Sequence, residues 1–306
     1  MFMPVIEIRA PDFDLEKTLD SGQVFHWEKS GDGFVGAIGD RAVYVEQRGD
    51  TLRVLIEDGA PATLGGRRAK RPGSRELAPP VQELVARYFA LDHPLEEICD
   101  SFPKDPAMNA ARGFCHGLRI IRQPKWECLA TFICSSMKQV AHIRQISLAL
   151  RSRFGEQRRI DDHFVYTFPS ARRLSQASEK ELLECKLGYR AKNLRATARL
   201  VGAGNATLEA WSALSDSEIR EQLCALPGVG PKIANCVMLF AYERLRAFPI
   251  DVWIERVLRQ KYFPRQRKMT AQRLRQFSET YFGEHGGYAQ QYLFHHARMA
   301  SKRSRV

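Results

Sequence analysis

The chain has 306 residues, which is too long for one small core and fits two or three packed units. Its 47 Lys and Arg residues against 35 Asp and Glu give a formal charge of +12, which favours an acidic partner: nucleic acid, an anionic membrane or an acidic protein. The sequence shows no apolar run of about 18 residues and no secretory signal at its start, so we expect an intracellular protein without a membrane span.

The first 60 or so residues predict a β-rich unit. Apolar and polar residues nearly alternate through 33–58, and Gly-Asp pairs at 39–40 and 49–50 interrupt the pattern as hairpin turns would. Residues 59–80 are rich in Gly, Pro and Arg and predict a surface loop. Its basic part, 64–75, is either a phosphate contact or, as we favour, a solvated loop.

From Pro80 onward the pattern becomes helical. Apolar residues recur at helical spacing in 81–92, and the strongly apolar 126–134 predicts a central helix. Further helices are expected at 140–155, 179–202 (as two helices), 216–226, 231–243, 251–263 and 271–282. The fold class is therefore α+β, with an antiparallel sheet unit over 1–105 and a helical domain over 106–306.

The cysteines argue against disulfides and metal. There are seven, an odd number, scattered along a long chain without a CxxC pair. We therefore expect reduced thiols and neither a zinc site nor another bound metal.

A glycine-rich turn separates two expected helices at 216–243. Gly228, Val229 and Gly230 permit a tight turn, and Pro231 suits the first position of a helix. The free N–H groups of that helix make an anion site that suits a DNA phosphate. The other interpretation is a plain turn between helices, but this helix–hairpin–helix pattern is more specific than that.

Lys232 lies in the first turn of the second helix. A protonated amine is no nucleophile, but the positive helix end and partial burial both disfavour the ammonium form. This favours attack on an electrophilic carbon, although a surface lysine that contacts phosphate is the simpler reading. Cys236 falls one turn later on the same face and either desolvates the amine or fills the core, which we favour slightly.

Asp251 opens the helix expected over 251–263. Its simplest role is an N-cap, and a capping carboxylate is held rigidly. The same group can stabilise positive charge that develops on a sugar when its base leaves. The two roles are compatible.

At this point the sequence resembles a known family, the helix–hairpin–helix DNA glycosylases, and within them the 8-oxoguanine DNA glycosylases. Nearly the whole chain carries blocks similar to that family in the same order. They are LEKTLDSGQVFHW (15–27), VARYFALD (85–92), ECLATFICSS (127–136), LGYRAK (187–192), LPGVGPKIANC (226–236), IDVW (250–253) and YAQQYLF (288–294).

The resemblance implies a bifunctional repair enzyme that flips an oxidised purine out of duplex DNA. Lys232 would displace the base and form a Schiff base with the sugar, β-elimination would nick the strand, and Asp251 would stabilise the transition state and help to position Lys232. The sheet unit would be TBP-like, and no cofactor is needed. No cysteine follows Cys236, so the C-terminal cysteine set of the iron–sulfur glycosylases is missing. The partner would be double-stranded DNA with a damaged purine, bound by a monomer.

Four residues would form the pocket for the flipped base by this resemblance. The Gly22 carbonyl would accept the N7 hydrogen that only the oxidised base carries, and guanine would leave that acceptor unpaired. Phe294 and Cys236 would sandwich the base, while Gln290 would bond its Watson–Crick edge. Gln290 and Phe294 share a helix face, which supports a common pocket wall.

The contacts with the opposite strand depart from the family pattern. Tyr189 and Arg190 resemble the family's pair near the estranged base. The family commonly has an asparagine run where this chain has Met137, an arginine where it has His142, and a phosphate-binding histidine where it has Trp253. Met137 can fill the vacated stack but cannot read cytosine, so we predict a weaker preference for cytosine opposite the lesion.

Three other functions compete with this reading. A monofunctional alkylpurine glycosylase of the same fold would lack a lysine at position 232. A DNA-binding protein without catalysis would need neither Lys232 nor Asp251. A protein-interaction scaffold has no support in the sequence.

Overall fold

An antiparallel sheet forms the N-terminal unit of this computed structural model, which describes residues 5–57, 80–136, 138–266 and 269–303. The five strands lie in the order β1-β5-β4-β3-β2. They are β1 (Ile6–Arg9), β2 (Glu28–Ser30), β3 (Gly33–Ile38), β4 (Arg41–Arg48) and β5 (Thr51–Ile56). The predicted hairpin turns are confirmed, because Gly39 and Gly49 connect β3 to β4 and β4 to β5 with φ of +62° and +57°.

Helices make up most of the remaining chain, and the predicted ones are present. They are α1 (Leu15–Asp20), α2 (Val81–Tyr88), α3 (Leu95–Asp100), α4 (Pro106–Phe114), α5 (Lys125–Cys134), α6 (Val140–Phe154), α7 (Ala171–Gln176), α8 (Glu179–Glu184), α9 (Arg190–Gly202), α10 (Asp216–Cys224), α11 (Pro231–Ala241), α12 (Val252–Val257), α13 (Ala271–Tyr281) and α14 (Gly286–Arg303). A π-helical turn, Leu258–Tyr262, continues α12. Helix α5 is buried from Glu127 to Cys134, which confirms its central place.

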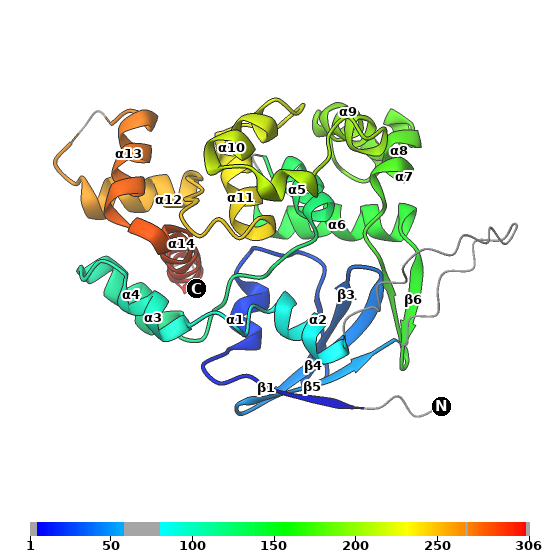
Figure 1. The fold of residues 1–306 in the computed structure, drawn as a ribbon, viewed down its shortest axis with the longest axis horizontal. Helices are drawn as coiled ribbons and strands as arrows, with labels where there is room; N and C mark the ends of the chain where they lie inside the picture. Colours follow the sequence, from blue (N-terminus) through cyan, green and yellow to red (C-terminus); the bar gives the residue numbers. More distant parts are fainter. Residues whose placement is uncertain (1–4, 58–79, 137, 267–268, 304–306) are drawn as a thin grey trace, which may run out of the picture.

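The apolar residues form two main cores. One lies between the sheet and helices α1 and α2, and the other, which is larger, lies among the remaining helices. Leu95 and Ile98 of α3 belong to the helical core although they precede the predicted boundary at residue 105. Figure 1 shows the sheet below and the α5–α6 and α10–α11 helices above it. The α+β class is confirmed.

A second, two-stranded sheet was not predicted. Strands β6 (Gln157–Ile160) and β7 (His163–Tyr166) pair after α6, and Ile160 and Val165 pack against Val35 and Ala42 of the main sheet. Each strand has only four residues, several of them charged, so the alternation is too short to signal a strand. This hairpin ties the helical part back to the sheet.

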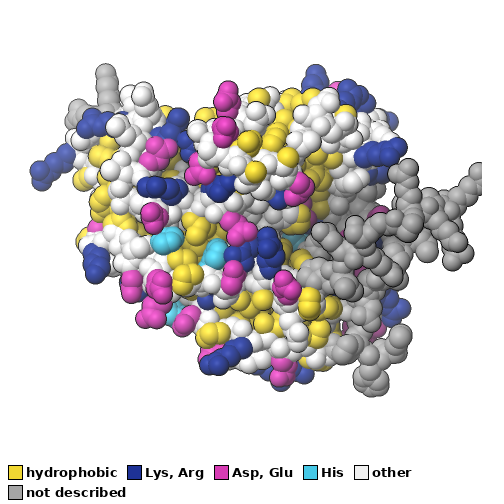
Figure 2. Space-filling view, in the orientation of Figure 1, with side chains coloured by type: hydrophobic (Ala, Val, Ile, Leu, Met, Phe, Trp, Pro, Cys, Tyr) yellow, Lys and Arg dark blue, Asp and Glu magenta, His cyan; other side chains and the backbone are white. Residues whose placement is uncertain are grey.

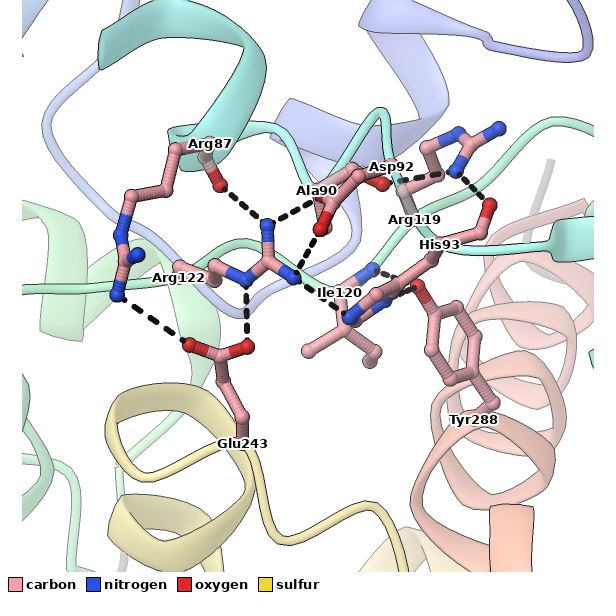
Figure 3. Close-up of polar contacts among 9 residues, drawn as sticks. All are labelled: Arg87, Ala90, Asp92, His93, Arg119, Ile120, Arg122, Glu243 and Tyr288. Carbon is pink, nitrogen blue, oxygen red and sulfur yellow. Dashed lines mark hydrogen bonds and ion pairs between the residues drawn. The ribbon is translucent and has the colours of Figure 1, made fainter. Parts of the chain in front are cut away.

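The segment 118–123 anchors α14 through polar contacts that run from the exposed Asp92 to the buried Tyr288 (Figure 3). The Tyr288 hydroxyl accepts from the Ile120 N–H at 3.2 Å and lies 2.8 Å from His93 Nδ1. The Arg122 guanidinium bonds Asp92 and Glu243, and the Tyr292 hydroxyl donates to the Leu118 carbonyl at 3.0 Å. These bonds fix the helix that carries Gln290 and Phe294.

The surface in Figure 2 mixes acidic and basic side chains, so the excess positive charge is not gathered into one patch on that face. The basic loop at 64–75 and Met137 lie outside the described residues. Within the described part of the chain, none of the helices combines the length and the apolar character needed to cross a membrane.

Candidate active site

The hairpin between α10 and α11 is built on glycine. Gly228 has φ +80°, and a Cβ there would lie 2.7 Å from the Cβ of Asn193 on α9. Gly230 is the N-cap of α11, Pro231 follows at the first position, and no described side chain caps the helix. The first N–H groups of α11 are therefore available to an anion, as the sequence predicts.

Lys232 lies half-buried at the start of α11 with its amine turned toward the end of α5. Its Nζ donates a hydrogen bond of 3.2 Å to the Ser135 hydroxyl. The same nitrogen lies 5.3 Å from the centre of the Phe132 ring. The amine is thus held between a hydroxyl acceptor and an aromatic face.

Cys236 and Asp251 lie close enough to Lys232 for their charges to interact. Burial raises the pKa of the Cys236 thiol to about 11, and the neighbouring amine opposes that rise. Burial also raises the pKa of the Asp251 carboxyl, which hydrogen bonds from backbone N–H groups and the charge of Lys232 oppose. Asp251 Oδ1 accepts from Ile254 N at 2.8 Å, so the predicted N-cap of α12 is confirmed.

Gly22 lies in a turn after α1 in which the neighbouring carbonyls already have partners. Arg298 bonds the carbonyl of Asp20, Gln291 that of Ser21, and Gln123 that of Gln23. The Gly22 carbonyl accepts no hydrogen bond from any residue that the structure describes. It is therefore the free acceptor of this turn.

Phe294 lies next to Gly22, and Gln290 stands one helical turn before Phe294 on α14. A Cβ at Gly22 would lie 3.1 Å from Phe294 Cε1 and 3.4 Å from Val140 Cγ2. Gln290 is buried and its Oε1 has no hydrogen-bond partner among the described residues. An unpaired buried amide oxygen costs about 1–3 kcal/mol, and a ligand that donates to it removes that cost.

Two contacts join this region to Lys232. Phe25, three residues after Gly22, packs its ring 6.2 Å from that of Phe132. Val140 at the start of α6 reaches Gly22, while Ser135 at the end of α5 reaches Lys232. The connection between α5 and α6 therefore spans from the amine to the Gly22 turn.

The predicted opposite-strand residues are placed unequally. Tyr189 is 61% exposed, and His142 is exposed in the first turn of α6. Arg190 is buried, and its guanidinium bonds the carbonyls of Ser136 and Leu187. Trp253 is partly buried, and the Arg256 guanidinium lies 5.3 Å from the centre of the Trp253 ring. Base contact by Arg190 stays a prediction.

Sequence reasoning missed three residues of this arrangement. Ser135 directly follows the helix predicted at 126–134, and Phe132 and Val140 lie within predicted helices without a predicted role in the site. Their contacts with Lys232 and Gly22 cross between elements far apart in the chain. A serine at the end of a helix carries no signal that distinguishes it from an ordinary cap.

Comparisons with known proteins identify the family of the chain. Residues 5–129 match the family model described as the N-terminal domain of 8-oxoguanine DNA glycosylase, and residues 130–281 match that of the HhH-GPD superfamily of base excision DNA repair proteins. The chain is 30% identical to N-glycosylase/DNA lyase OGG1 of Arabidopsis thaliana, over 94% of this chain and 78% of that protein.

Solved structures give the same result. The structure of MBOgg1 in complex with a low affinity DNA ligand has a TM-score of 0.85 and 31% identity, covering 98% of this chain and 100% of that one. The Clostridium acetobutylicum 8-oxoguanine glycosylase/lyase with double-stranded DNA, cytosine opposite 8-oxoguanine, has a TM-score of 0.83 and 27% identity, with coverage of 98% and 100%. The chain therefore belongs to the 8-oxoguanine DNA glycosylase family of the HhH-GPD superfamily.

Proposed function

We propose that this protein is a base excision repair glycosylase and lyase that removes 8-oxoguanine and related oxidised purines from duplex DNA. Family membership supports the reaction class, since the Arabidopsis thaliana N-glycosylase/DNA lyase and the Clostridium acetobutylicum 8-oxoguanine glycosylase/lyase both match over most of this chain. The observation that carries the assignment is Lys232, whose amine lies at the helix that follows the hairpin and in electrostatic contact with Asp251.

Lys232 is the nucleophile of the proposed reaction. Its nitrogen bonds to C1′ as the C1′–N9 bond breaks, and the electron pair leaves with the base, which takes up a proton. Opening of the sugar ring gives a Schiff base, and β-elimination removes a C2′ proton and breaks the C3′–O bond. The Asp251 carboxylate stabilises the positive charge that develops on the sugar.

The flipped base occupies the region between Gly22, Cys236, Gln290 and Phe294. The free Gly22 carbonyl accepts the N7 hydrogen of 8-oxoguanine, and the unpaired Gln290 amide bonds the Watson–Crick edge. Guanine lacks the N7 hydrogen and would set its lone pair against the carbonyl. One buried acceptor therefore provides the discrimination.

DNA is gripped by its backbone and opened beside the lesion. The N–H groups around Gly228, Val229 and Gly230 bind one phosphate without reading sequence. Tyr189 wedges at the estranged base, with Arg190, Met137 and His142 near it. The chain acts as a monomer with neither metal nor iron–sulfur cluster, and its substrate places it inside the cell, in a bacterial cytoplasm or a nucleus.

A monofunctional alkylpurine glycosylase is the alternative, and it is not favoured. That activity needs the carboxylate of Asp251 but no amine at position 232. The Lys232 amine here bonds the Ser135 hydroxyl at 3.2 Å, which argues against a role as a surface phosphate contact.

Borohydride trapping on a duplex with one 8-oxoguanine opposite cytosine tests the proposal. We expect a covalent adduct with the wild type and with Lys104→Gln, an exposed lysine away from the hairpin, but none with Lys232→Gln. An adduct with Lys232→Gln would move the nucleophile elsewhere. Base release by the wild type without any adduct would support the monofunctional alternative.

A further inference from the structure

Ser135 is the residue that holds the Lys232 amine in this structure. It is the C-cap of α5 and is 5% exposed. Its hydroxyl donates to the Phe132 carbonyl at 2.7 Å and accepts from Lys232 Nζ at 3.2 Å. A lysine side chain has several rotatable bonds, so its reactive nitrogen needs such a partner to stay in one place.

The direction of these bonds matters for chemistry. Because the single hydroxyl proton is committed to Phe132, Ser135 can act toward Lys232 only as an acceptor. It therefore bonds an N–H of Lys232 and leaves the nitrogen lone pair of the neutral amine unblocked. The Phe132 ring on one side, at 5.3 Å, further limits where the nitrogen can move.

Arg190 holds the other side of the same turn. Its Nε donates to the Ser136 carbonyl at 2.8 Å, a second guanidinium nitrogen bonds the same oxygen, and Nη1 donates to the Leu187 carbonyl at 3.1 Å. The guanidinium also lies 4.3 Å from the ring centre of Tyr189, which is 61% exposed. A continuous line of contacts thus runs from the exposed Tyr189 through Arg190 and Ser136 to Ser135 and Lys232.

We propose that Ser135 is a positioning residue for Lys232 and that Arg190, through the Ser136 carbonyl, fixes the position of Ser135. This inference rests on the proposed role of Lys232 as nucleophile. It implies that a movement of Tyr189 and Arg190 on the DNA is transmitted to the nucleophile through the Ser135-Ser136 peptide. The segments 135–136 and 189–190, which are far apart in the sequence, would then both act on the Lys232 amine.

The test is single-turnover borohydride trapping with saturating protein, on 8-oxoguanine DNA and on a preformed abasic site. We expect Ser135→Ala to trap about 10- to 100-fold more slowly on both substrates, because small misplacement of a reacting atom has effects of that size. DNA affinity should stay within about twofold of the wild type, since no phosphate contact changes. Ser101→Ala is the matched control, because Ser101 caps α3 with the same 2.7 Å bond to a carbonyl but faces no lysine.

A pair of variants separates positioning from folding. Ser135→Thr and Ser135→Val have nearly the same shape and differ in the hydroxyl. We expect the threonine variant to keep trapping within about threefold of the wild type and the valine variant to lose it as alanine does. Equal trapping by the two variants would overturn the inference.

Arg190→Gln tests the second half of the line of contacts. On the abasic site, its loss of trapping should not add to that of Ser135→Ala in the double variant, because both act through one turn. Fully additive losses would overturn the link to Arg190. Wild-type trapping by Ser135→Ala beside an inactive Lys232→Gln would overturn this inference alone, whereas trapping by Lys232→Gln would overturn the proposed nucleophile and this inference with it.

Discussion

Phe294 lies against Gly22, so that a Cβ added at position 22 would be 3.1 Å from Phe294 Cε1. The two residues are far apart in the chain, and their contact brings a free backbone carbonyl beside an aromatic ring. Gly22 also has φ +83°, a region that other residues adopt only with strain. Both facts make the position sensitive to the smallest substitution.

Gly22→Ala should separate base excision from the lyase step. The methyl group would enter the proposed base pocket, so we expect excision of 8-oxoguanine to fall about tenfold or more. Cleavage of a preformed abasic site should change little, since no base occupies the pocket. Gly31→Ala controls for backbone strain, because Gly31 has φ +55° and open space around it. Equal losses on both substrates would contradict the pocket assignment.

Gly228→Ala should weaken binding to all DNA alike. The added Cβ would meet Asn193 and displace the hairpin, so we expect about tenfold lower affinity for damaged and undamaged duplexes, with a salt slope smaller by about one. Gly204→Ala is the control, because Gly204 shares φ +80° but has no atom within 4 Å of its added Cβ. Loss of affinity confined to damaged DNA would show that the hairpin reads the lesion.

Asp251→Asn should remove activity without loss of stability. Burial raises the pKa of this carboxyl in the folded protein. Its ionised form therefore opposes folding at every pH above the pKa that the carboxyl has in the unfolded chain, including neutral pH. Asparagine caps a helix as well as aspartate does and carries no charge. We expect an unchanged or higher Tm and excision slower by about 10²–10³-fold. A Tm several degrees lower would contradict this account.

Buried histidines should make the protein less stable in mild acid. Burial lowers the pKa of His93, and the Arg122 guanidinium beside it acts in the same direction. Burial also lowers the pKa of His295, to about 4. As the pH falls below about 6.5, the unfolded chain takes up these protons first, so the free energy of unfolding decreases.

His93→Gln tests this sign. The guanidinium of Arg122 can only donate, so His93 Nε2 accepts and Nδ1 carries the hydrogen directed at Tyr288. Glutamine reproduces that neutral pattern without a titrating group. We expect the wild type to lose stability relative to the variant as the pH falls below about 6.5. Denaturant unfolding from neutral to mildly acid pH measures it, and parallel curves would contradict the prediction.

The preference for the base opposite the lesion tests the departures from the family pattern. We expect the wild type to excise 8-oxoguanine opposite all four bases with rates within about tenfold of one another, because His142 stands where the family has an arginine. His142→Arg should raise excision opposite cytosine about tenfold relative to the others, since a good bidentate contact contributes about 1–3 kcal/mol. His142→Gln serves as the uncharged control. A strong cytosine preference in the wild type would contradict the prediction.

The local elements and the family could be predicted from the amino-acid sequence. The α5 and α11 helices follow from apolar runs, the β3–β4 and β4–β5 turns from Gly-Asp pairs, and the hairpin from two glycines and a proline, because each of these signals depends on neighbouring residues. The same blocks carried Lys232 and Asp251 as candidates. The β6–β7 hairpin was missed because its stability comes from packing on the main sheet rather than from its own pattern.

Which polar atoms of the site are paired, and with which partners, depends on the folded structure. It leaves the Gly22 carbonyl without a partner among the residues that the structure describes, binds Arg190 to the Ser136 carbonyl and holds the Lys232 amine at Ser135. The two bonded pairs join residues 54 and 97 positions apart, and the strength of these bonds depends on distance and burial in the folded core. A linear pattern contains neither quantity, so the residue types could be predicted while their partners could not.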